Sequence, residues 1–580
     1  MTHQNKTYTN AELADIFERI ANLLEIKGEV VFKIRAYTRA AESLRVLGED
    51  INTVAAEKRL DKIPGVGKAI SEKIQELLDT GSLRFLEKLE SEVPPSLLEL
   101  LEVPDLGPRK ASLFWKELGI TNLAELEQAA REGKLRGLPG MGQKSEQRII
   151  AGIEALGRRT DRMTLGTAWE HARRWLEWIR SQPGVSRAEV GGSLRRWRET
   201  IGDLDIVVAR DADSPVMENF IHHDEVARII AKGENKSSVE LKNGVRIQLW
   251  AQPPEKFGSL WLYATGSKAH NVRLREMALK KHLSLSDQGM LKEDGELLLF
   301  AEEEEIYKVL GLPIMDPEIR EDRGEIEAAL QKRLPRLITV NDLRAELHAH
   351  STWSDGTASI AEMARAAVAK GYTTLVITDH SASLGITRGL DAHRLEEQHK
   401  EIEQVRAELG DSLTLLHGIE VDIMADGSLA LPDEVLAKLD IVIASLHTSL
   451  RQPRETITAR LLKAIRSPHV DIIGHPSGRL LPNREGADLD WDAVLKAAKE
   501  AGVALEINAS PSRLDLNDVY ARRAAGLGIP LAINTDAHQP ATYDESVYGV
   551  SVARRAWVEP DQVINTWDSR KIVEWLKNRQ

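Results

Sequence analysis

Residues 342–580 repeat one pattern: a short apolar run, a histidine or carboxylate at its end, and then a stretch with helical periodicity. TLVITDH, IVIASLH and IIGH have the β-branched content of buried strands, and IAEMARAAVAKG and LDWDAVLKAAKEAG are typical of the helical stretches. Alternating strands and helices predict a parallel sheet or barrel, in which the carboxyl ends of the strands meet on one face. We therefore expect an α/β domain here, with its chemistry at that face.

The polar residues that end these strands have the chemistry of metal ligands. His348 and His350, at i and i+2 of one strand, point the same way and can chelate one ion. One histidine at a strand end is usually a structural hydrogen-bonding group, but nine candidates at successive ends favour a metal centre. Imidazole mixed with carboxylate suits Zn²⁺ or Mn²⁺, and nine ligands suffice for up to three ions. The candidate ligands are His348, His350, Asp355, His380, Glu420, His447, His475, Asp536 and His538. His417 falls outside this pattern and is interpreted as structural.

A second candidate site lies in GGSLRRWRETIGDLDIVV, residues 191–208. Asp203 and Asp205 share a strand face, and two neighbouring carboxylates repel each other unless a cation lies between them. Mg²⁺ is typically held by one or two carboxylates together with substrate phosphates. The backbone, hydroxyl and guanidinium groups that would face such a phosphate belong to Gly192, Ser193 and either Arg195 or Arg196. The alternative is an ordinary surface strand that carries two acidic residues by chance.

The first 160 residues have helical periodicity and contain one motif three times, as LDKIPGVGK, VPDLGPRK and LPGMGQK. Each copy places a glycine-permitted turn before a helix, which exposes backbone N–H groups as an anion site. We expect these turns to bind the DNA backbone without reading bases. The alternative is three helical hairpins whose glycines only form turns, and the second copy departs from the motif at Asp105. The candidate DNA-binding residues are Gly65, Gly67, Lys68, Gly107, Lys110, Gly140, Gly142 and Lys144.

These motifs and their order resemble the bacterial family X DNA polymerases that carry a C-terminal PHP (polymerase and histidinol phosphatase) domain. The turns resemble helix-hairpin-helix motifs, residues 191–208 resemble the nucleotidyltransferase signature, and ELHAHSTWSDG through NTDAH resembles PHP domains. The resemblance implies a multidomain α/β protein with helical N-terminal domains, an α+β beta-type nucleotidyltransferase palm with a thumb, and a PHP (β/α) barrel. The implied parts are a lyase-like helical domain with the first motif (1–90), a fingers-like domain with the other two (91–160), the palm (161–255), the thumb (256–318), a linker (319–341) and the PHP domain (342–580).

The same resemblance implies gap-filling DNA synthesis by the palm and 3′-5′ exonuclease activity of the PHP domain. It makes Asp203 and Asp205 ligands of Mg²⁺ or Mn²⁺, and the nine PHP positions the ligands of a three-metal site. Gly192, Ser193 and Arg196 then bind the triphosphate of a dNTP. In YATGSKAHNVRLREMA, the positions that match the family's nucleotide pocket are Tyr263, Gly266, Asn271 and Arg275.

The chain departs from the family at the third palm carboxylate. The hairpin VELKNGVRIQLW (239–250), with a two-residue turn predicted at Asn243 and Gly244, places Gln248 where the family has an aspartate. Glutamine supplies neither the charge that two divalent ions require nor an acceptor for the primer 3′-hydroxyl proton. Glu240, on the partner strand, is predicted to pair near Ile247 and to face the wrong side. The sequence therefore leaves undecided whether the palm synthesises DNA.

Lys73 matches a lysine that forms a Schiff base with an abasic sugar in some members of the family. A lysine nucleophile requires a lowered pKa, to which neighbouring Lys68 would contribute. The alternative, which the sequence favours, is a plain phosphate contact.

Composition limits the setting. The 580 residues exceed what one core can hold, no apolar run approaches the ~18 residues of a membrane span, and MTHQNKTYTN is not a signal peptide. The absence of cysteine excludes disulfides and thiolate metal sites, and the net charge of −13 argues against a uniformly basic nucleic-acid binder while leaving local basic patches. We expect a monomeric, cytoplasmic, nucleoid-associated DNA-repair enzyme that binds gapped or nicked DNA and dNTP. Two alternatives remain: a non-catalytic scaffold for gapped DNA, and a PHP small-molecule phosphatase.

Overall fold

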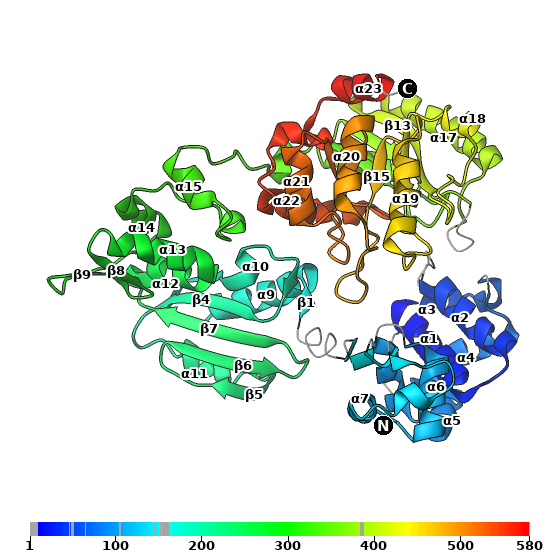
Figure 1. Ribbon diagram of the computed structural model, residues 1–580, viewed down its shortest axis with the longest axis horizontal. Coiled ribbons are helices and arrows are strands. Elements are labelled where there is room, and N and C mark those ends of the chain that lie inside the picture. The colour runs from blue at the N-terminus through cyan, green and yellow to red at the C-terminus, as the bar shows by residue number, and fades with distance from the viewer. Residues whose placement is uncertain are drawn as a thin grey trace. The chain divides into compact units, whose positions relative to one another are not determined.

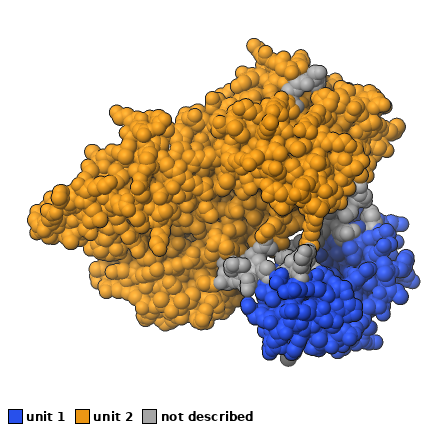
Figure 2. Space-filling view, in the orientation of Figure 1, with its two compact units in different colours: residues 1–161 blue, residues 162–580 orange. Residues whose placement is uncertain are grey.

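The computed structural model divides into two compact units, residues 1–161 and 162–580 (Figure 2). It describes residues 8, 10–45, 47, 51–63, 65–103, 106–143, 145–147, 149, 150, 152, 153, 162–382 and 388–578. No helix within these ranges is long and apolar enough to cross a membrane.

The first unit is helical, as its periodicity predicts. Its helices are α1 (Asn10–Lys27), α2 (Val31–Arg45), α3 (Ile51–Ala56), α4 (Lys68–Thr80), α5 (Arg84–Glu92), α6 (Pro108–Leu118) and α7 (Leu123–Arg131), with 3₁₀ turns at Leu60–Lys62, Pro95–Glu102 and Leu135–Gly137. One apolar core, which includes Leu13 and Phe17 of α1 and Phe114 of α6, holds them together. The turns before α4 and α6 are thereby fixed on a packed scaffold.

The palm is a five-stranded sheet in the order β2-β4-β7-β6-β5 (Figure 1). Its strands are β2 (Val185–Val190), β4 (Leu204–Arg210), β5 (Val226–Ala231), β6 (Lys236–Leu241) and β7 (Arg246–Gln252), with a small pair β1 (Met163–Thr164) and β3 (Thr200–Ile201) and the helices α9 (Leu165–Arg180), α10 (Gly192–Arg195) and α11 (Val216–Ile221). β4 and β7 are parallel and in a register that pairs Asp205 with Gln248. The two strands that carry the candidate palm residues therefore lie side by side.

The hairpin between β6 and β7 corrects two details of the prediction. Glu240 pairs with Arg246, next to the predicted Ile247, and so lies on the same face as Gln248 and not on the opposite one. Leu241 N–H donates to the Val245 carbonyl, so the connection is one residue longer than a two-residue turn. Gly244, at a φ of +82°, supplies the left-handed residue that such a three-residue loop requires. The Glu240 carboxylate pairs with Arg228 of β5 at 2.7 Å, which takes it away from the aspartates.

The thumb consists of α12 (Phe257–Thr265), α13 (Lys268–Leu279), α14 (Glu303–Leu310) and a small sheet of β8 (Leu283–Ser286), β9 (Gly289–Lys292) and β10 (Leu297–Leu298). The chain that follows, with α15 (Glu325–Leu330), is packed against this core. Arg320 is fully buried and donates to the Glu303 carboxylate at 2.7 Å and to the Met315 carbonyl at 2.9 Å. The first part of the segment expected to be a linker is thus fixed to the thumb.

The C-terminal domain confirms the predicted (β/α) barrel. Seven parallel strands lie in sequence order: β11 (Ala345–Ala349), β12 (Thr374–Ile377), β13 (Thr414–Asp422), β14 (Ile441–Ser445), β15 (Ile472–Gly474), β16 (Ala504–Asn508) and β17 (Leu531–Asn534). A parallel bridge between Ala349 and Ala537 nearly closes the sheet. The helices lie on its outside (Figure 1): α16 (Ile360–Ala369), α17 (Ala392–Leu409), α18 (Asp433–Leu436), α19 (Arg454–Ile465), α20 (Trp491–Ala501), α21 (Asp518–Gly526), α22 (Ser546–Arg555) and α23 (Ser569–Lys577).

Candidate metal centre and palm site

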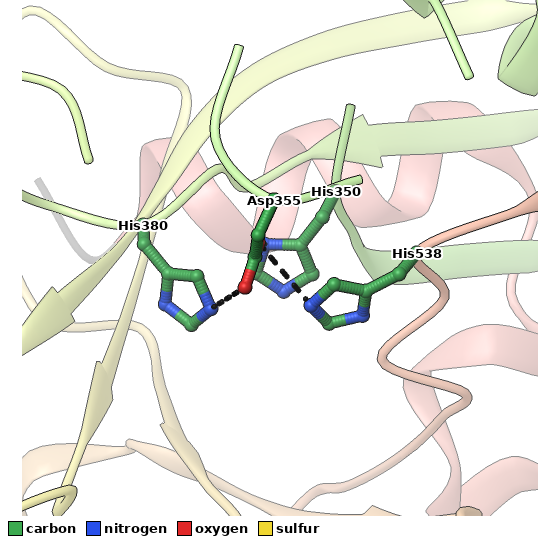
Figure 3. Close-up of side chains that lie close together, drawn as sticks. All are labelled: His350, Asp355, His380 and His538. Carbon is green, nitrogen blue, oxygen red and sulfur yellow. Dashed lines mark ion pairs between the residues drawn. The ribbon is translucent and has the colours of Figure 1, made fainter. Parts of the chain in front are cut away.

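The carboxyl ends of the barrel strands bring all nine candidate ligands into one buried network. His348 lies on β11 and Glu420 on β13, whereas the other residues lie in the segments directly after strands. Figure 3 shows His380 and His538 pointing toward Asp355, which comes from the segment after β11. The same residues could not form a site if the strands were antiparallel, because their carboxyl ends would then alternate between two faces.

The candidate ligands form three overlapping groups, in each of which one atom per residue lies within 4.8 Å of the others. The groups are His350, Asp355, His380 and His538; His348, His350, Glu420 and Asp536; and His380, Glu420 and His447. His475 joins through its Nε2 atom, 2.9 Å from Glu420 Oε1. The arrangement offers three adjacent positions that share ligands.

The charges in this network are strongly coupled. Burial opposes ionisation of Glu420, but the charges of His380, His447 and His348 outweigh it and hold the pKa of this carboxyl well below its usual range. Burial likewise opposes charge on His348, yet Glu506, Asp536 and Glu420 raise its pKa well above that of free histidine. Burial and the charges of His538 and His380 lower the pKa of His350 to about 4. In this network, protons on the histidines offset the carboxylate charge that bound metal ions would offset.

Several buried ligand atoms have no hydrogen-bond partner within the described part of the chain. They are Nε2 of His348, Nδ1 of His350, Nδ1 of His380, Oε2 of Glu420 and Nδ1 of His475. A buried polar atom without a partner costs about 1–3 kcal/mol, so such a cluster is unfavourable unless an ion occupies it. Together with the mixed imidazole and carboxylate donors, these atoms fit transition-metal ions.

A second layer of side chains, which the sequence pattern did not single out, orients the ligands. Asp422 Oδ1 lies 2.6 Å from His447 Nδ1, and Glu506 Oε1 lies 2.7 Å from His348 Nδ1. Asn508 donates to Asp536 at 3.2 Å. Glu506 and Asn508 belong to β16, and its sequence ALEIN, preceded by Val503, is apolar at the other positions, as expected of a buried strand. Treating that run as one more strand with polar residues at its end would have found both.

The palm carboxylates are held by N–H donors from β7. The Gln248 side-chain amide donates to Asp203, and the Trp250 indole donates to Asp205 Oδ1 at 3.0 Å. Burial, and next the charge of Asp203, raise the pKa of Asp205 to about 6. Asp203 lies directly before β4 and not on the strand. Gln248 therefore takes a hydrogen-bonding role toward a carboxylate where the sequence comparison places a third one.

The turn before α10 touches this site directly. Gly192 has a φ of +56°, and a Cβ added there would overlap the Asp205 carboxylate, 3.0 Å from its Cγ atom. Gly191 N–H donates to the Asp205 backbone carbonyl at 2.7 Å. Ser193, the next residue of α10, is half-buried. Only glycine fits at position 192 in this conformation.

Arg196 is engaged in an ion pair. Its Nε donates to Glu321 at 3.1 Å and its Nη1 to the Thr265 carbonyl. Arg555 of α22 donates to the same Glu321 oxygen at 3.0 Å and to the Arg196 carbonyl at 2.7 Å. Arg195 pairs with buried Glu303 at 2.6 Å. A phosphate that binds Arg196 has to compete with Glu321.

The residues expected in the nucleotide pocket surround the junction of α12 and α13. Asn271 donates to the Tyr263 carbonyl at 2.9 Å, while its own Oδ1 is buried without a partner in the described chain. Gly266 ends α12 with a φ of +72°. A Cβ atom added to Gly266 would lie 3.1 Å from Arg196 Nη1. The Arg275 guanidinium lies 5.6 Å from the centre of the half-exposed Tyr263 ring.

The three turns of the first unit have the expected place before helices. Gly65 and Gly67 precede α4, which begins at Lys68, and Gly107 precedes α6, which contains Lys110. The N-cap residues Gly67 and Gly107 make no side-chain cap hydrogen bond, as an anion site at these turns would require. In the third turn, Gly140 and Gly142 are exposed, and Lys144 lies outside the described residues.

Lys73 lies on the exposed face of α4. Its Nζ donates to the Ala69 carbonyl at 3.1 Å and lies 5.1 Å from the centre of the Phe85 ring.

Four family models match the chain. A helix-hairpin-helix domain matches residues 8–83, a SAM-like helix-hairpin-helix tandem 97–155, a DNA polymerase beta thumb 260–321 and a PHP domain 346–510. A protein of Bacillus subtilis (strain 168) named DNA polymerase/3′-5′ exonuclease PolX is 38% identical over 98% of this chain and 99% of its own. DNA polymerase lambda of Rattus norvegicus is 24% identical over 55% of this chain and 57% of its own.

A probable phosphatase of Thermoanaerobacter sp. (strain X514) is 36% identical over 40% of this chain and 95% of its own. The PolX similarity, in contrast, extends over nearly the whole of both chains and includes the helical, thumb and PHP regions. On these comparisons the chain belongs to the bacterial PolX family of DNA polymerases with a PHP domain.

Proposed function

We propose that this protein is a DNA-repair enzyme whose PHP domain is a metal-dependent 3′-5′ exonuclease and whose palm has weak polymerase activity. The observation that carries the first part is the buried network of nine imidazole and carboxylate ligands with unpartnered donor atoms. The relative named DNA polymerase/3′-5′ exonuclease PolX, which this chain matches from end to end, supports the choice of substrate.

The chain's own residues prepare the PHP site for phosphodiester hydrolysis. Zn²⁺ or Mn²⁺ ions at the three positions would supply a hydroxide near neutral pH and offset the charge of the phosphodiester oxygens. Glu420, central to two of the three groups, is kept anionic by the surrounding histidines. Asp422 and Glu506 fix which nitrogen of His447 and His348 faces the centre.

The exonuclease proposal is tested with His348→Ala and His475→Ala. Each should reduce nucleotide release from 3′-labelled DNA by at least ~100-fold, because each removes a buried ligand. His393→Ala is the matched control, since this histidine is exposed, lies outside the nine candidate ligands and pairs with Glu397 at 3.7 Å. Unchanged release by both ligand variants would contradict the proposal.

For the palm, we propose that a dNTP binds but is added slowly to a primer. Gln248 pairs with Asp205 across the two strands, at the position where the family resemblance implies a third carboxylate, and its amide donates a hydrogen bond to Asp203 where the reaction would require a proton acceptor. Gln248→Asp should raise primer extension with Mg²⁺ or Mn²⁺ by ~10-fold or more. Rapid extension by the unaltered protein, with no gain in the variant, would contradict this part.

The helical first unit is proposed to hold gapped or nicked DNA through the uncapped N-termini of α4 and α6. The domain limits given from the sequence belong to this proposal, as does action as a monomer in the cytoplasm on nucleoid DNA. Lys73 is proposed as a phosphate contact; borohydride trapping of a covalent adduct with abasic DNA would instead establish lyase chemistry.

A second function has a specific observation behind it. The probable phosphatase of Thermoanaerobacter matches the PHP portion over nearly its own full length, so phosphomonoester hydrolysis is the competing activity of this centre. Release of inorganic phosphate from small monoesters, without release of nucleotides from DNA, would favour it. Metal analysis that finds no bound ion would favour the scaffold alternative.

A further inference from the structure

The segment after β16 carries an arginine to the edge of the metal centre. Arg513 Nε lies 3.9 Å from Oδ2 of the candidate ligand Asp536, and the Arg513 side chain is 20% exposed. At that distance the two groups attract each other but share no hydrogen bond. The Arg513 guanidinium donates no hydrogen bond within the described ranges, so its donors are free to meet a ligand at the centre.

A second guanidinium belongs to the turn at residues 480–484, where Leu481 N–H donates at 2.6 Å to the carbonyl of Ser512, the residue before Arg513. Arg484 donates through Nε and Nη2 to the Gly478 carbonyl, at 3.1 and 2.7 Å, and its Nη1 donates to none of the described residues. Burial, and next the charge of Arg513, lower the pKa of Arg484, and the same two causes lower that of His475. The neighbouring carboxylate of Asp515 is already engaged by Ser477, through N–H and hydroxyl bonds of 2.9 Å each. Two cations thus repel each other beside the metal ligands.

A third arginine, Arg479, fixes the backbone of Arg513. Arg479, which follows the ligand His475 by four residues and is 9% exposed, donates through Nε to the Arg513 carbonyl at 2.8 Å and through Nη2 to the Leu514 carbonyl. Its Nη2 also donates to Glu199 of the palm at 2.9 Å. Arg479 uses its N–H donors to bond the backbone carbonyls of Arg513 and Leu514 and the Glu199 carboxylate, so it acts as a positioning residue. The N–H donors of Arg513, in contrast, bond none of the described residues.

We infer that Arg513 and Arg484 form a phosphate-binding edge of the metal centre, which receives the phosphate of the 3′-terminal nucleotide of DNA. Guanidinium groups bind phosphate oxygens in a bidentate fashion, and a like-charged pair next to each other gains most from an anion between them. The carboxylates Glu420, Asp355 and Asp536 would otherwise repel a polyanion from this side. Neither arginine is one of the nine ligands, and the inference rests on the proposed exonuclease function only for the identity of the phosphate.

The test compares Arg513→Gln, Arg513→Lys and Arg484→Gln with the matched control Arg454→Gln, a half-exposed arginine on α19 whose ion pair with Asp488 is long, at 3.7 Å. On metal-loaded protein, Arg513→Gln should weaken binding of inorganic phosphate ~10-fold and raise KM for a single-stranded 3′ end by a similar factor. Arg484→Gln should have a smaller effect in the same direction. The phosphate affinity and KM of Arg513→Lys should lie between those of the unaltered protein and Arg513→Gln, because lysine keeps the positive charge but cannot bind phosphate in a bidentate fashion.

Metal content measured on every variant separates substrate binding from damage to the centre. Weaker phosphate binding with unchanged metal content supports the edge, and rescue by Arg513→Lys excludes a purely structural role. Unchanged phosphate affinity and KM in Arg513→Gln, with metal intact, overturns it. If the unaltered protein releases no nucleotide, the exonuclease proposal fails, while the phosphate measurement still decides the role of the arginines.

Discussion

At the scale of single residues, the candidate metal centre contains carboxylates that contact its histidines but are not among the nine candidate ligands. Asp422 orients His447, and its other oxygen accepts from Ser381 at 3.1 Å. Glu506 contacts His348 through one oxygen and accepts the His475 backbone N–H at 2.6 Å through the other. Each such residue fixes the tautomer of a ligand and limits the directions in which its ring can turn.

Asp422→Asn should therefore lower the affinity for transition-metal ions ~10–100-fold without unfolding the barrel. The amide cannot keep His447 in the same protonation state as the carboxylate does. Metal competition with a chromophoric chelator gives the affinity, and circular dichroism checks the fold. Asp426→Asn is the control and should bind metal as before, because Asp426 lies in an exposed turn where its carboxylate accepts from Ser428.

Metal uptake should also release protons. His348 and His380 have pKa values well above the ordinary value for histidine when no ion is present, so both carry protons at pH 7 that a bound ion must displace. Affinity should fall as pH is lowered, and titration calorimetry in buffers of different ionisation enthalpy should report about two protons released from this pair. Release of none would contradict the protonated state assigned here.

At the scale of elements, strand ends and turns decide which residues meet. The turn that joins β2 to α10 brings Gly192 against Asp205. Gly192→Ala should destabilise the palm by about 1–2 kcal/mol or more from its left-handed φ alone, and displace the carboxylate as well. Differential scanning calorimetry and nucleotide-binding fluorescence measure the two effects. Gly202→Ala is the control, because its Cβ would meet only the flexible end of Arg162.

The contact between β13 and α17 contains a histidine that should make this domain sensitive to acid. His417 is 4% exposed and bonds Gln398 at 3.0 Å; burial, and next the neighbouring His399, lower its pKa to about 4. The unfolded value is near 6.5, so this histidine stabilises the fold fully above that pH and progressively less as pH falls toward 4. The loss at pH 5 is about 2 kcal/mol.

His417→Gln should remove most of this pH dependence. The difference in Tm between pH 7 and pH 5, at one scan rate, should be smaller in the variant than in the unaltered protein. His469→Gln serves as a comparison with no expected change in that difference. Equal differences in all three proteins would show that His417 is not the titrating group.

The elements were largely predictable, and the contacts between them were not. Alternation of apolar runs with helical stretches predicted the barrel, because each strand is buried on both faces and each helix on one. The alternation did not predict the hydrogen bond from Trp250 to Asp205 or the ion pair between Arg196 and Glu321. Both depend on register and on side-chain direction across segments that are distant in the sequence. The packing of Arg320 was missed because its charge marked the segment as exposed.

At the scale of the whole molecule, residues 162–580 behave as one compact unit that contains both candidate sites. Part of its cohesion comes from a buried group of charges. Arg555 is 4% exposed and donates to Glu321 and to Asp518, each at 3.0 Å, and Arg323 shares Asp518 at 2.9 Å. The pairs join a helix of the PHP domain to the segment that follows the thumb.

Arg555→Met should destabilise this unit by about 1–3 kcal/mol, because Glu321 and Asp518, both largely buried, each lose one of their guanidinium partners. Scanning calorimetry should record a lower Tm for the transition of this unit. Arg523→Met is the matched control: its pair with Asp492 is half-exposed, so its Tm should change little. A similar loss in both variants would contradict the importance of burial.

The single carboxylate of Glu321, shared by Arg196 of the palm and Arg555 of the PHP domain, has a consequence for how the two domains influence each other. A triphosphate that bound Arg196 would leave Glu321 to Arg555 and to Arg198, whose Nη1 lies 3.9 Å away, and would so strengthen the pair with Arg555. By thermodynamic reciprocity, whatever strengthens the hold of Arg555 on Glu321 favours the triphosphate to the same degree. If the palm binds a triphosphate as proposed, nucleotide binding is energetically coupled to the contact between Glu321 and Arg555 of the PHP domain, although no ligand passes between the two sites.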